Sequence, residues 1–251
     1  YGYSIICIDN LNLKNLSKNI NTRNIITYSV NQKSDVKISS IIKNQNNTKF
    51  SLYFKKGFIE NVSGKFNFTT TLLGDHNVLN STAAIIAALI AKVPIENISN
   101  SLSSFQGVKR RFSFLGKINK ASIYDDYAHH PSEIKASYEI AKQISKKNII
   151  IIFQPHRFTR TSILLNDFIK ILKKIKILYV LDIYSAGEKP IKGISSKNLV
   201  NKLKNNNKNI YYVKSEKNLD LILKPYFEDD NAIVFMGAGS ITHMAQNLFI
   251  K

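Results

Sequence analysis

The stretch Ile149-Ile150-Ile151-Ile152-Phe153 is followed directly by Gln154-Pro155-His156-Arg157-Phe158-Thr159-Arg160-Thr161. An uninterrupted apolar run that ends at a polar turn is typical of a strand buried on both faces. A helical pattern covers residues 161–175, and another apolar run begins at Ile177. Strand, polar turn, helix and strand in this order predict one unit of a parallel sheet with crossover helices.

The same alternation extends from residue 107 to the end of the chain. Strands are expected near 122–124, 149–153, 177–181, 210–213 and 232–235, and helices near 132–146, 161–175, 196–205, 216–223 and 240–249. We therefore predict an α/β domain over residues 107–251, with a Rossmann-like, doubly wound and mostly parallel sheet.

Residues 1–106 follow a different pattern. Short alternating or β-branched runs predict strands at 25–28, 35–39, 50–54 and 66–70, and residues 1–9 resemble a strand already under way. Gly74-Asp75-His76-Asn77 ends this pattern and opens an apolar helix over about 77–92, which is followed by a second helix over about 95–105. We expect a domain boundary near residues 105–107. Because the sequence opens at Tyr1 inside a strand-like run, we expect it to be part of a larger protein.

The composition narrows the classes of function. Among 251 residues the formal net charge is +19, which by itself suggests nucleic-acid or anionic-membrane binding. The charge is mostly scattered lysine, however, and no basic stretch is interleaved with aromatic residues. A solvated surface is therefore favoured over a polyanion-binding face, and a small anionic substrate fits as well. We expect neither a nucleic-acid nor a membrane partner.

Cysteine content and hydropathy narrow the class of protein further. Cys7 is the sole cysteine, which excludes a disulfide framework or a cysteine-based metal site within the chain. The longest apolar stretch, residues 83–93, is too short to span a bilayer. A soluble cytoplasmic protein is expected, while its oligomeric state is not indicated.

The chemically richest segments all follow expected strands. They are Asp125-Asp126-Tyr127-Ala128-His129-His130-Pro131, Gln154 to Thr161, Tyr184-Ser185-Ala186-Gly187-Glu188-Lys189 and Gly237-Ala238-Gly239-Ser240. In an open parallel sheet, ligands bind beyond the carboxyl ends of the strands. We therefore expect these segments to converge on one site.

Each segment also has a purely structural interpretation. Asp125 or Asp126 could cap the helix that starts near Pro131. Neighbouring histidines, His129 and His130, should point apart, and no third ligand has useful spacing, so zinc is not expected. The glycines of 237–240 either form half a phosphate cradle or only permit close packing.

Arg157 and Arg160 are three residues apart in a turn that contains His156 and enters a helix. Forked guanidinium groups near a helix N-terminus suit a carboxylate or a phosphate. The alternative is a surface pair bonded to acids. Asn77 and Asn80 lie one turn apart, where paired amides can read the edge of a planar heterocycle. The alternative for Asn77 is a helix N-cap.

These motifs together resemble the Mur ligases, and the alanine-adding member most closely. The resemblance rests on residues 74–80, 105–112, 125–131, 154–161 and 185–188, which occur in the family's order. It covers residues 74–251 with high specificity, and residues 1–73 resemble the later part of the central ATP-binding domain more loosely.

The resemblance implies a function and its parts. ATP would phosphorylate the carboxylate of UDP-N-acetylmuramate, normally with Mg²⁺, and the amine of L-alanine would attack the acyl phosphate during peptidoglycan precursor synthesis. By resemblance, Asn77 and Asn80 would hold adenine with His76 beside them, and Arg111 and Asp126 would reach the nucleotide across the domain cleft. The L-alanine group would comprise His156, Arg157, Arg160 and Tyr127.

The sequence also departs from the family. A phosphate loop ending Gly-Lys-Thr or Gly-Lys-Ser is absent from the sequence, as are the upstream metal ligands and the UDP-binding domain. Asp75 occupies a position that is more often basic. We expect the chain alone to be inactive, because nothing in it cradles the β- and γ-phosphates. The alternatives are a ligase that recycles murein peptides, a basic nucleic-acid-binding protein and a non-catalytic fold with weak nucleotide affinity.

Overall fold

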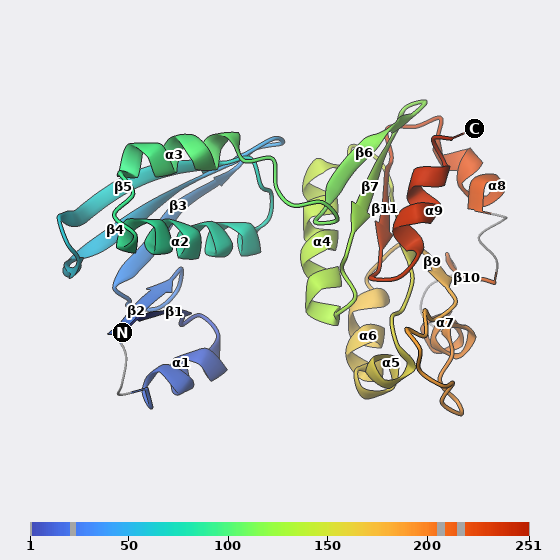
Figure 1. Ribbon diagram of the computed structural model, residues 1–251. Helices are drawn as coiled ribbons and strands as arrows, with labels where there is room; N and C mark the ends of the chain where they lie inside the picture. The colour runs from blue at the N-terminus through green and yellow to red at the C-terminus, as the bar shows by residue number, and fades with distance from the viewer. Residues whose placement is uncertain (1, 21–23, 205–208, 215–218, 251) are drawn as a thin grey trace. The chain divides into compact units, whose positions relative to one another are not determined.

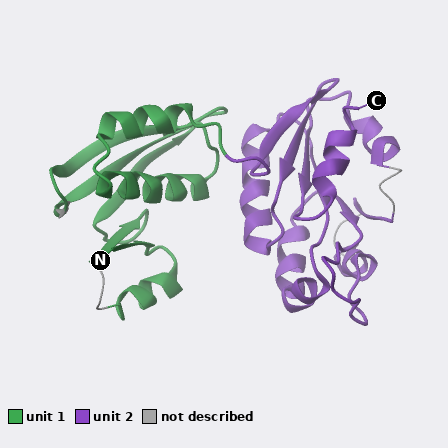
Figure 2. Ribbon diagram, in the orientation of Figure 1, with its two compact units in different colours: residues 1–107 green, residues 108–251 purple. Residues whose placement is uncertain are grey.

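The computed structural model describes residues 2–20, 24–204, 209–214 and 219–250. The chain divides into two compact units, Tyr1–Gly107 and Val108–Lys251 (Figure 2). Each unit has its own sheet, so each is described by itself.

The second unit is built on a six-stranded sheet in the order β10-β9-β8-β11-β7-β6 (Figure 1). Its strands are β6 (Ser113–Ile118), β7 (Ala121–Asp126), β8 (Ile149–Phe153), β9 (Ile177–Leu181), β10 (Ile210–Val213) and β11 (Ala232–Met236). All neighbours are parallel except β6 and β7. Its helices are α4 (Pro131–Ile144), α5 (Phe158–Ile163), α6 (Leu165–Leu172), α7 (Ser196–Lys204), α8 (Leu219–Leu223) and α9 (Ile241–Asn247), with a 3-10 turn at Lys224–Tyr226.

Helices cover both faces of this sheet. Ile151 and Phe153 of β8 pack with α4, α6 and α7, whereas Ile150 and Ile152 pack with α8 and α9. The side chains of these four β8 residues are fully buried, which is why the strand is an unbroken apolar run. The predicted doubly wound α/β fold is thus confirmed.

Two details of this unit were not predicted. The helix expected over 161–175 begins at Phe158 and breaks at Leu164, so that α5 and α6 are separate. The antiparallel strand β6 has a register shift between Phe114 and Gly116, which interrupts the alternation that a strand prediction needs. The helix expected over 216–223 is described only as α8, since residues 216–218 lie outside the described part.

The first unit contains a five-stranded sheet in the order β1-β2-β3-β4-β5. Its strands are β1 (Tyr3–Cys7), β2 (Asn24–Ser29), β3 (Val36–Lys43), β4 (Thr48–Ile59) and β5 (Val62–Thr70), of which β1 to β3 are parallel and β3 to β5 antiparallel. The helices α2 (Asp75–Ile90) and α3 (Ile95–Ser104) close its core. The short helix α1 (Leu11–Ser17), which was not predicted, buries none of its residues.

Helix α2 begins at Asp75, earlier than predicted, because Gly74 has a positive φ of 93° that suits glycine and turns the chain into the helix. Asp75 forms an ion pair of 2.6 Å with Lys43 of β3. Within the described residues, no helix combines the length and apolar character needed to cross a membrane.

Candidate active site

The segments that follow β7, β8 and β11 meet at the carboxyl edge of the second sheet. Gln154 N, just after β8, donates to Met236 O of β11 at 2.9 Å, and Gly237 N donates to Asp126 O of β7 at 2.9 Å. The loop after β9 joins them, because Tyr184 N donates to Pro155 O at 2.9 Å. Their expected convergence follows from the parallel sheet order.

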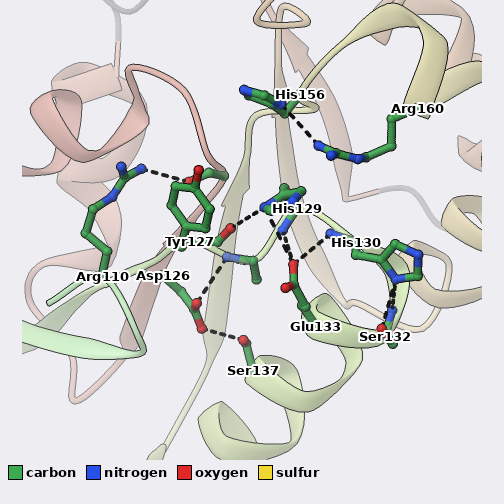
Figure 3. Close-up of polar contacts among 12 residues, drawn as sticks. Arg110, Asp126, Tyr127, His129, His130, Ser132, Glu133, Ser137, His156 and Arg160 are labelled. Atoms are coloured by element: carbon green, nitrogen blue, oxygen red, sulfur yellow. Dashed lines mark hydrogen bonds and ion pairs between the residues drawn. The ribbon is translucent and has the colours of Figure 1, made fainter. Parts of the chain in front are cut away.

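A line of aromatic and basic side chains crosses this edge (Figure 3). The Tyr127 and His129 rings have centroids 5.1 Å apart, and those of His129 and His156 are 5.8 Å apart. Arg160 Nη1 lies 3.1 Å from His156 Nδ1. Three of the four residues predicted for the amino-acid group, Tyr127, His156 and Arg160, are therefore brought together, with His129 between them.

Hydrogen-bond partners define the protonation pattern of the two histidines. A guanidinium can only donate, so the Nδ1 atom of His156 accepts and Nε2 carries the hydrogen. Burial, together with Arg160, His129 and Arg157, lowers the pKa of His156, which keeps it neutral at pH 7. The Nδ1 atom of His129 lies 2.8 Å from the carbonyl oxygen of Tyr127 and must donate to it, which leaves Nε2 as an acceptor in neutral His129.

Arg157 contributes through an unusual backbone conformation. Its φ is 70°, in the left-handed region that L residues seldom occupy, and its N–H donates to Tyr184 O at 2.8 Å. Its side chain is exposed next to His156. The sequence placed Arg157 and Arg160 as an equivalent pair, but only Arg160 contacts His156.

Asp126, predicted to reach a nucleotide, is only 5% exposed. Its carboxylate accepts hydrogen bonds from Ser137 Oγ and, at 3.1 Å, from Ala128 N. Burial raises the pKa of Asp126 to about 6. Arg111, its predicted companion, is exposed, and its guanidinium lies 5.7 Å from the Tyr127 ring centroid and 3.7 Å from Glu133.

His130 caps helix α4, so the alternative that Asp125 or Asp126 does so is wrong. The His130 side chain accepts from Ser132 N, and the Glu133 carboxylate accepts from His130 N at 3.1 Å. Glu133 also accepts from His129 N at 3.0 Å. This capping box fixes the backbone at the two histidines.

The glycine turn after β11 is filled by the protein itself. A Cβ atom at Gly239 would lie 2.5 Å from Tyr184 Cγ and 2.6 Å from Gln154 Oε1, and one at Gly237 would lie 2.8 Å from Gln154 O. Of the two interpretations of this turn, close packing therefore accounts for both glycines.

The residues predicted to hold adenine lie at the start of α2 in the first unit. Gly74 occupies the N-cap position, so the N-cap alternative for Asn77 is wrong. Asn77 Nδ2 donates to Leu73 O at 2.8 Å, and Asn80 Nδ2 donates to Asn77 Oδ1 at 3.4 Å, which places both amides on one face. Asn80 is exposed, whereas His76 is partly buried.

Sequence reasoning missed Arg110. Its guanidinium carbon lies 4.6 Å from the Tyr127 ring centroid, and its Nη2 donates to Gly237 O at 3.1 Å. The available signal was its position beside Arg111, but two adjacent arginines cannot be told apart by residue type alone.

The last feature of the site is the arrangement of its possible metal ligands. The part of the chain that the structure describes contains no group of three or more His, Cys, Asp or Glu side chains arranged to hold a metal ion.

Comparison with known proteins identifies the family. Residues 110–239 match the family model of the Mur ligase glutamate ligase domain, and residues 1–88 match that of the Mur ligase middle domain. The chain belongs to the Mur ligase family.

Two curated relatives are similar to this chain over nearly its whole length. The chain is 36% identical over 264 residues to the UDP-N-acetylmuramate–L-alanine ligase of Wigglesworthia glossinidia brevipalpis, covering 100% of this chain and 54% of the relative. It is 38% identical over 257 residues to the ligase of the same name from Rickettsia bellii (strain OSU 85-389), covering 99% and 53%. The chain thus spans about half the length of the curated relatives it matches.

Solved structures share the fold. The UDP-N-acetylmuramate-alanine ligase from Thermotoga maritima has a TM-score of 0.73 at 24% identity, over 90% of this chain and 47% of that one. MurF from Acinetobacter baumannii has a TM-score of 0.75 at 15% identity, over 100% and 52%. At these identities the likeness establishes the fold alone.

Proposed function

We propose that this chain is the nucleotide- and amino-acid-binding part of a cytoplasmic, ATP-dependent ligase that joins L-alanine to UDP-N-acetylmuramate. The observation that carries the proposal is the line of Tyr127, His129, His156 and Arg160 at the carboxyl edge of the second sheet. Relatives of that name, 36% and 38% identical across nearly the whole chain, support the choice of reaction.

Arg160, together with Arg157, receives the carboxylate of the amino acid. Arg160 Nη1 is bonded to neutral His156, so its remaining N–H groups are available for fork-like bonds to a carboxylate. The Nε2–H group of neutral His156 is a further hydrogen-bond donor. Two positive groups and a neutral donor suit a small zwitterion whose negative end must be fixed.

His129 supports the reaction at the other end of the amino acid. L-Alanine reaches the enzyme as an ammonium ion and must lose a proton before it can attack an acyl phosphate. The free Nε2 lone pair of His129 accepts that proton, and the Tyr127 carbonyl bonded to Nδ1 stabilises the imidazolium that results. The N–C bond then forms as the C–O bond to phosphate breaks, and inorganic phosphate leaves with the second proton of the amine.

Asn77 and Asn80 of the first unit bind the adenine, with His76 beside them. In the second unit, the exposed guanidinium of Arg111 suits a ribose or phosphate oxygen of a nucleotide. The two amides share one face of α2, which suits the edge of adenine. Asp126, already bonded to Ser137 Oγ and to Ala128 N, supports the backbone that follows Tyr127 from within the core. Mg²⁺ would neutralise phosphate charge when bound.

The test uses residues 1–251 joined to the part of the Wigglesworthia relative that this chain does not match. We expect ADP release that requires both UDP-N-acetylmuramate and L-alanine, and formation of the alanyl product. ADP release with a tripeptide but not with L-alanine would instead identify a murein-peptide-recycling ligase. Salt-sensitive binding to nucleic acid without any ADP binding would overturn both.

A further inference from the structure

The loop after β9 is fastened to the turn that carries the arginines. His156 and Tyr184 form a parallel β-bridge, and their rings stack with centroids 5.6 Å apart. Further along the same loop, the Glu188 carboxylate accepts from Thr159 N at 3.0 Å and from Thr159 Oγ1 at 2.6 Å. Thr159 lies between Arg157 and Arg160, so this contact acts at the centre of the turn.

Glu188 supplies a cap that helix α5 lacks. Arg157 occupies the N-cap position and makes no side-chain capping bond. A carboxylate bonded to a first-turn N–H is the usual replacement, and here it comes from another loop. The bonds from Thr159 hold the pKa of Glu188 below its usual range, so the group is ionised at neutral pH.

The turn needs such support because its backbone is strained. The left-handed φ of 70° at Arg157 costs an L residue about 1–2 kcal/mol and persists only where surrounding bonds enforce it. The bonds that enforce it are Arg157 N to Tyr184 O on one side and Thr159 to Glu188 on the other.

We propose that Glu188 is a positioning residue for amino-acid recognition, which acts through Thr159 to aim Arg157 and Arg160. This inference rests on the proposed function, since the amino acid is the ligand that the turn receives. A competing role is electrostatic, because a carboxylate near two arginines would weaken their attraction for a substrate carboxylate. The two roles predict opposite effects of removing the side chain.

The first experiment measures kinetics in the fused, complete enzyme described above. If Glu188 positions the turn, Glu188→Ala should raise the KM for L-alanine about tenfold and leave the KM for ATP within about twofold. Glu188→Gln can keep both bonds, by accepting from Thr159 N and donating to Thr159 Oγ1, so it should stay close to the parent. If the role is electrostatic, both variants should lower the KM for L-alanine, and that result overturns the proposal. Lys189→Ala is the control in the same loop.

The second experiment uses the 251-residue chain and needs no activity. Hydrogen exchange at the Thr159 amide should accelerate about tenfold in Glu188→Ala and remain as in the parent in Glu188→Gln. Unchanged exchange in Glu188→Ala overturns the proposal. If the complete parent enzyme shows no L-alanine dependence, the proposed function fails, while the exchange result still decides whether Glu188 orders the turn.

Discussion

The guanidinium of Arg110 lies over the ring of Tyr127, with its central carbon 4.6 Å from the ring centroid. The same guanidinium donates from Nη2 to Gly237 O at 3.1 Å, and its Nε lies 3.9 Å from Asp125 Oδ2. Arg110 therefore connects the segment after β7 with the glycine turn after β11, and it defines the position of the Tyr127 ring.

Replacing Arg110 with Met should destabilise the second unit by about 1–2 kcal/mol, because a cation–π contact and a charged hydrogen bond are lost together. Urea unfolding of the 251-residue chain measures this change. Arg111→Met is the matched control, since Arg111 is exposed and its contact with Tyr127 is longer. Equal losses for both variants would contradict the assigned role of Arg110.

Arg160→Ala should raise the KM for L-alanine in the complete enzyme by the equivalent of about 2–3 kcal/mol, the worth of a lost charged partner. Steady-state kinetics with L-alanine varied at saturating ATP provides the measurement. An unchanged KM would remove Arg160 from the amino-acid site.

Gly239→Ala should cost about 1–3 kcal/mol of folding free energy by overpacking. The backbone of Gly239 can accept alanine, so the cost comes from its Cβ meeting Tyr184 and Gln154. Thermal and urea unfolding report the loss. In the double variant with Tyr184→Ala, part of it should be recovered, and strict additivity of the two changes would show that Tyr184 does not cover the turn.

Asp126 should make folding stability fall with rising pH. Burial raises its pKa from 3.8 to about 6, so the folded carboxyl keeps a proton that the unfolded chain has lost. Its contribution is complete below about pH 4 and is lost by about pH 6, which corresponds to about 2–3 kcal/mol.

Asp126→Asn should remove this slope, so the stability of the variant relative to the parent should increase between pH 4 and pH 6. Ser137→Ala removes a bond that lowers the pKa of Asp126, and it should extend the slope to higher pH. Urea unfolding at several pH values tests both variants. A stability difference independent of pH would show that Asp126 is not the group responsible.

Asn80→Leu should weaken ATP binding and leave L-alanine binding near normal in the complete enzyme. Because Asn80 is exposed, stability should change by no more than about 0.5 kcal/mol, whereas Asn77→Leu should cost about 1 kcal/mol through its lost bond to Leu73 O. Equal loss of both ligands in Asn80→Leu would indicate misfolding instead.

Three of the six strands of the second sheet could be predicted residue by residue, whereas the antiparallel strand β6 was not predicted. Strands β8, β9 and β10 begin and end where the sequence predicted. For β8 and β9 the reason is that parallel strands buried on both faces are continuous apolar runs. That the segments carrying Tyr127 and His156 lie at one edge followed from the same sheet, since the carboxyl ends of parallel strands lie at the same edge.

Other parts of the site depend on contacts that no local pattern encodes. Glu188 lies 29 positions after Thr159 in the sequence and contacts it from a separate loop. Arg110 has a φ of 62°, and its guanidinium lies over the Tyr127 ring. Arg111, one residue away, has the same side chain, so residue type does not tell the two apart. His130 was an unlikely cap by residue preference, and the local signal for it was Glu133, which completes a capping box three residues later.

At Arg157, the left-handed backbone lowers folding stability, whereas the guanidinium serves the proposed binding of the amino acid. Glycine adopts this conformation without strain, so Arg157→Gly removes a local cost of about 1 kcal/mol while deleting the guanidinium. A library selected only for heat resistance would therefore enrich glycine here, and the enriched enzymes would handle their amino-acid substrate poorly. At this residue, improving the scaffold and preserving the chemistry are opposing demands.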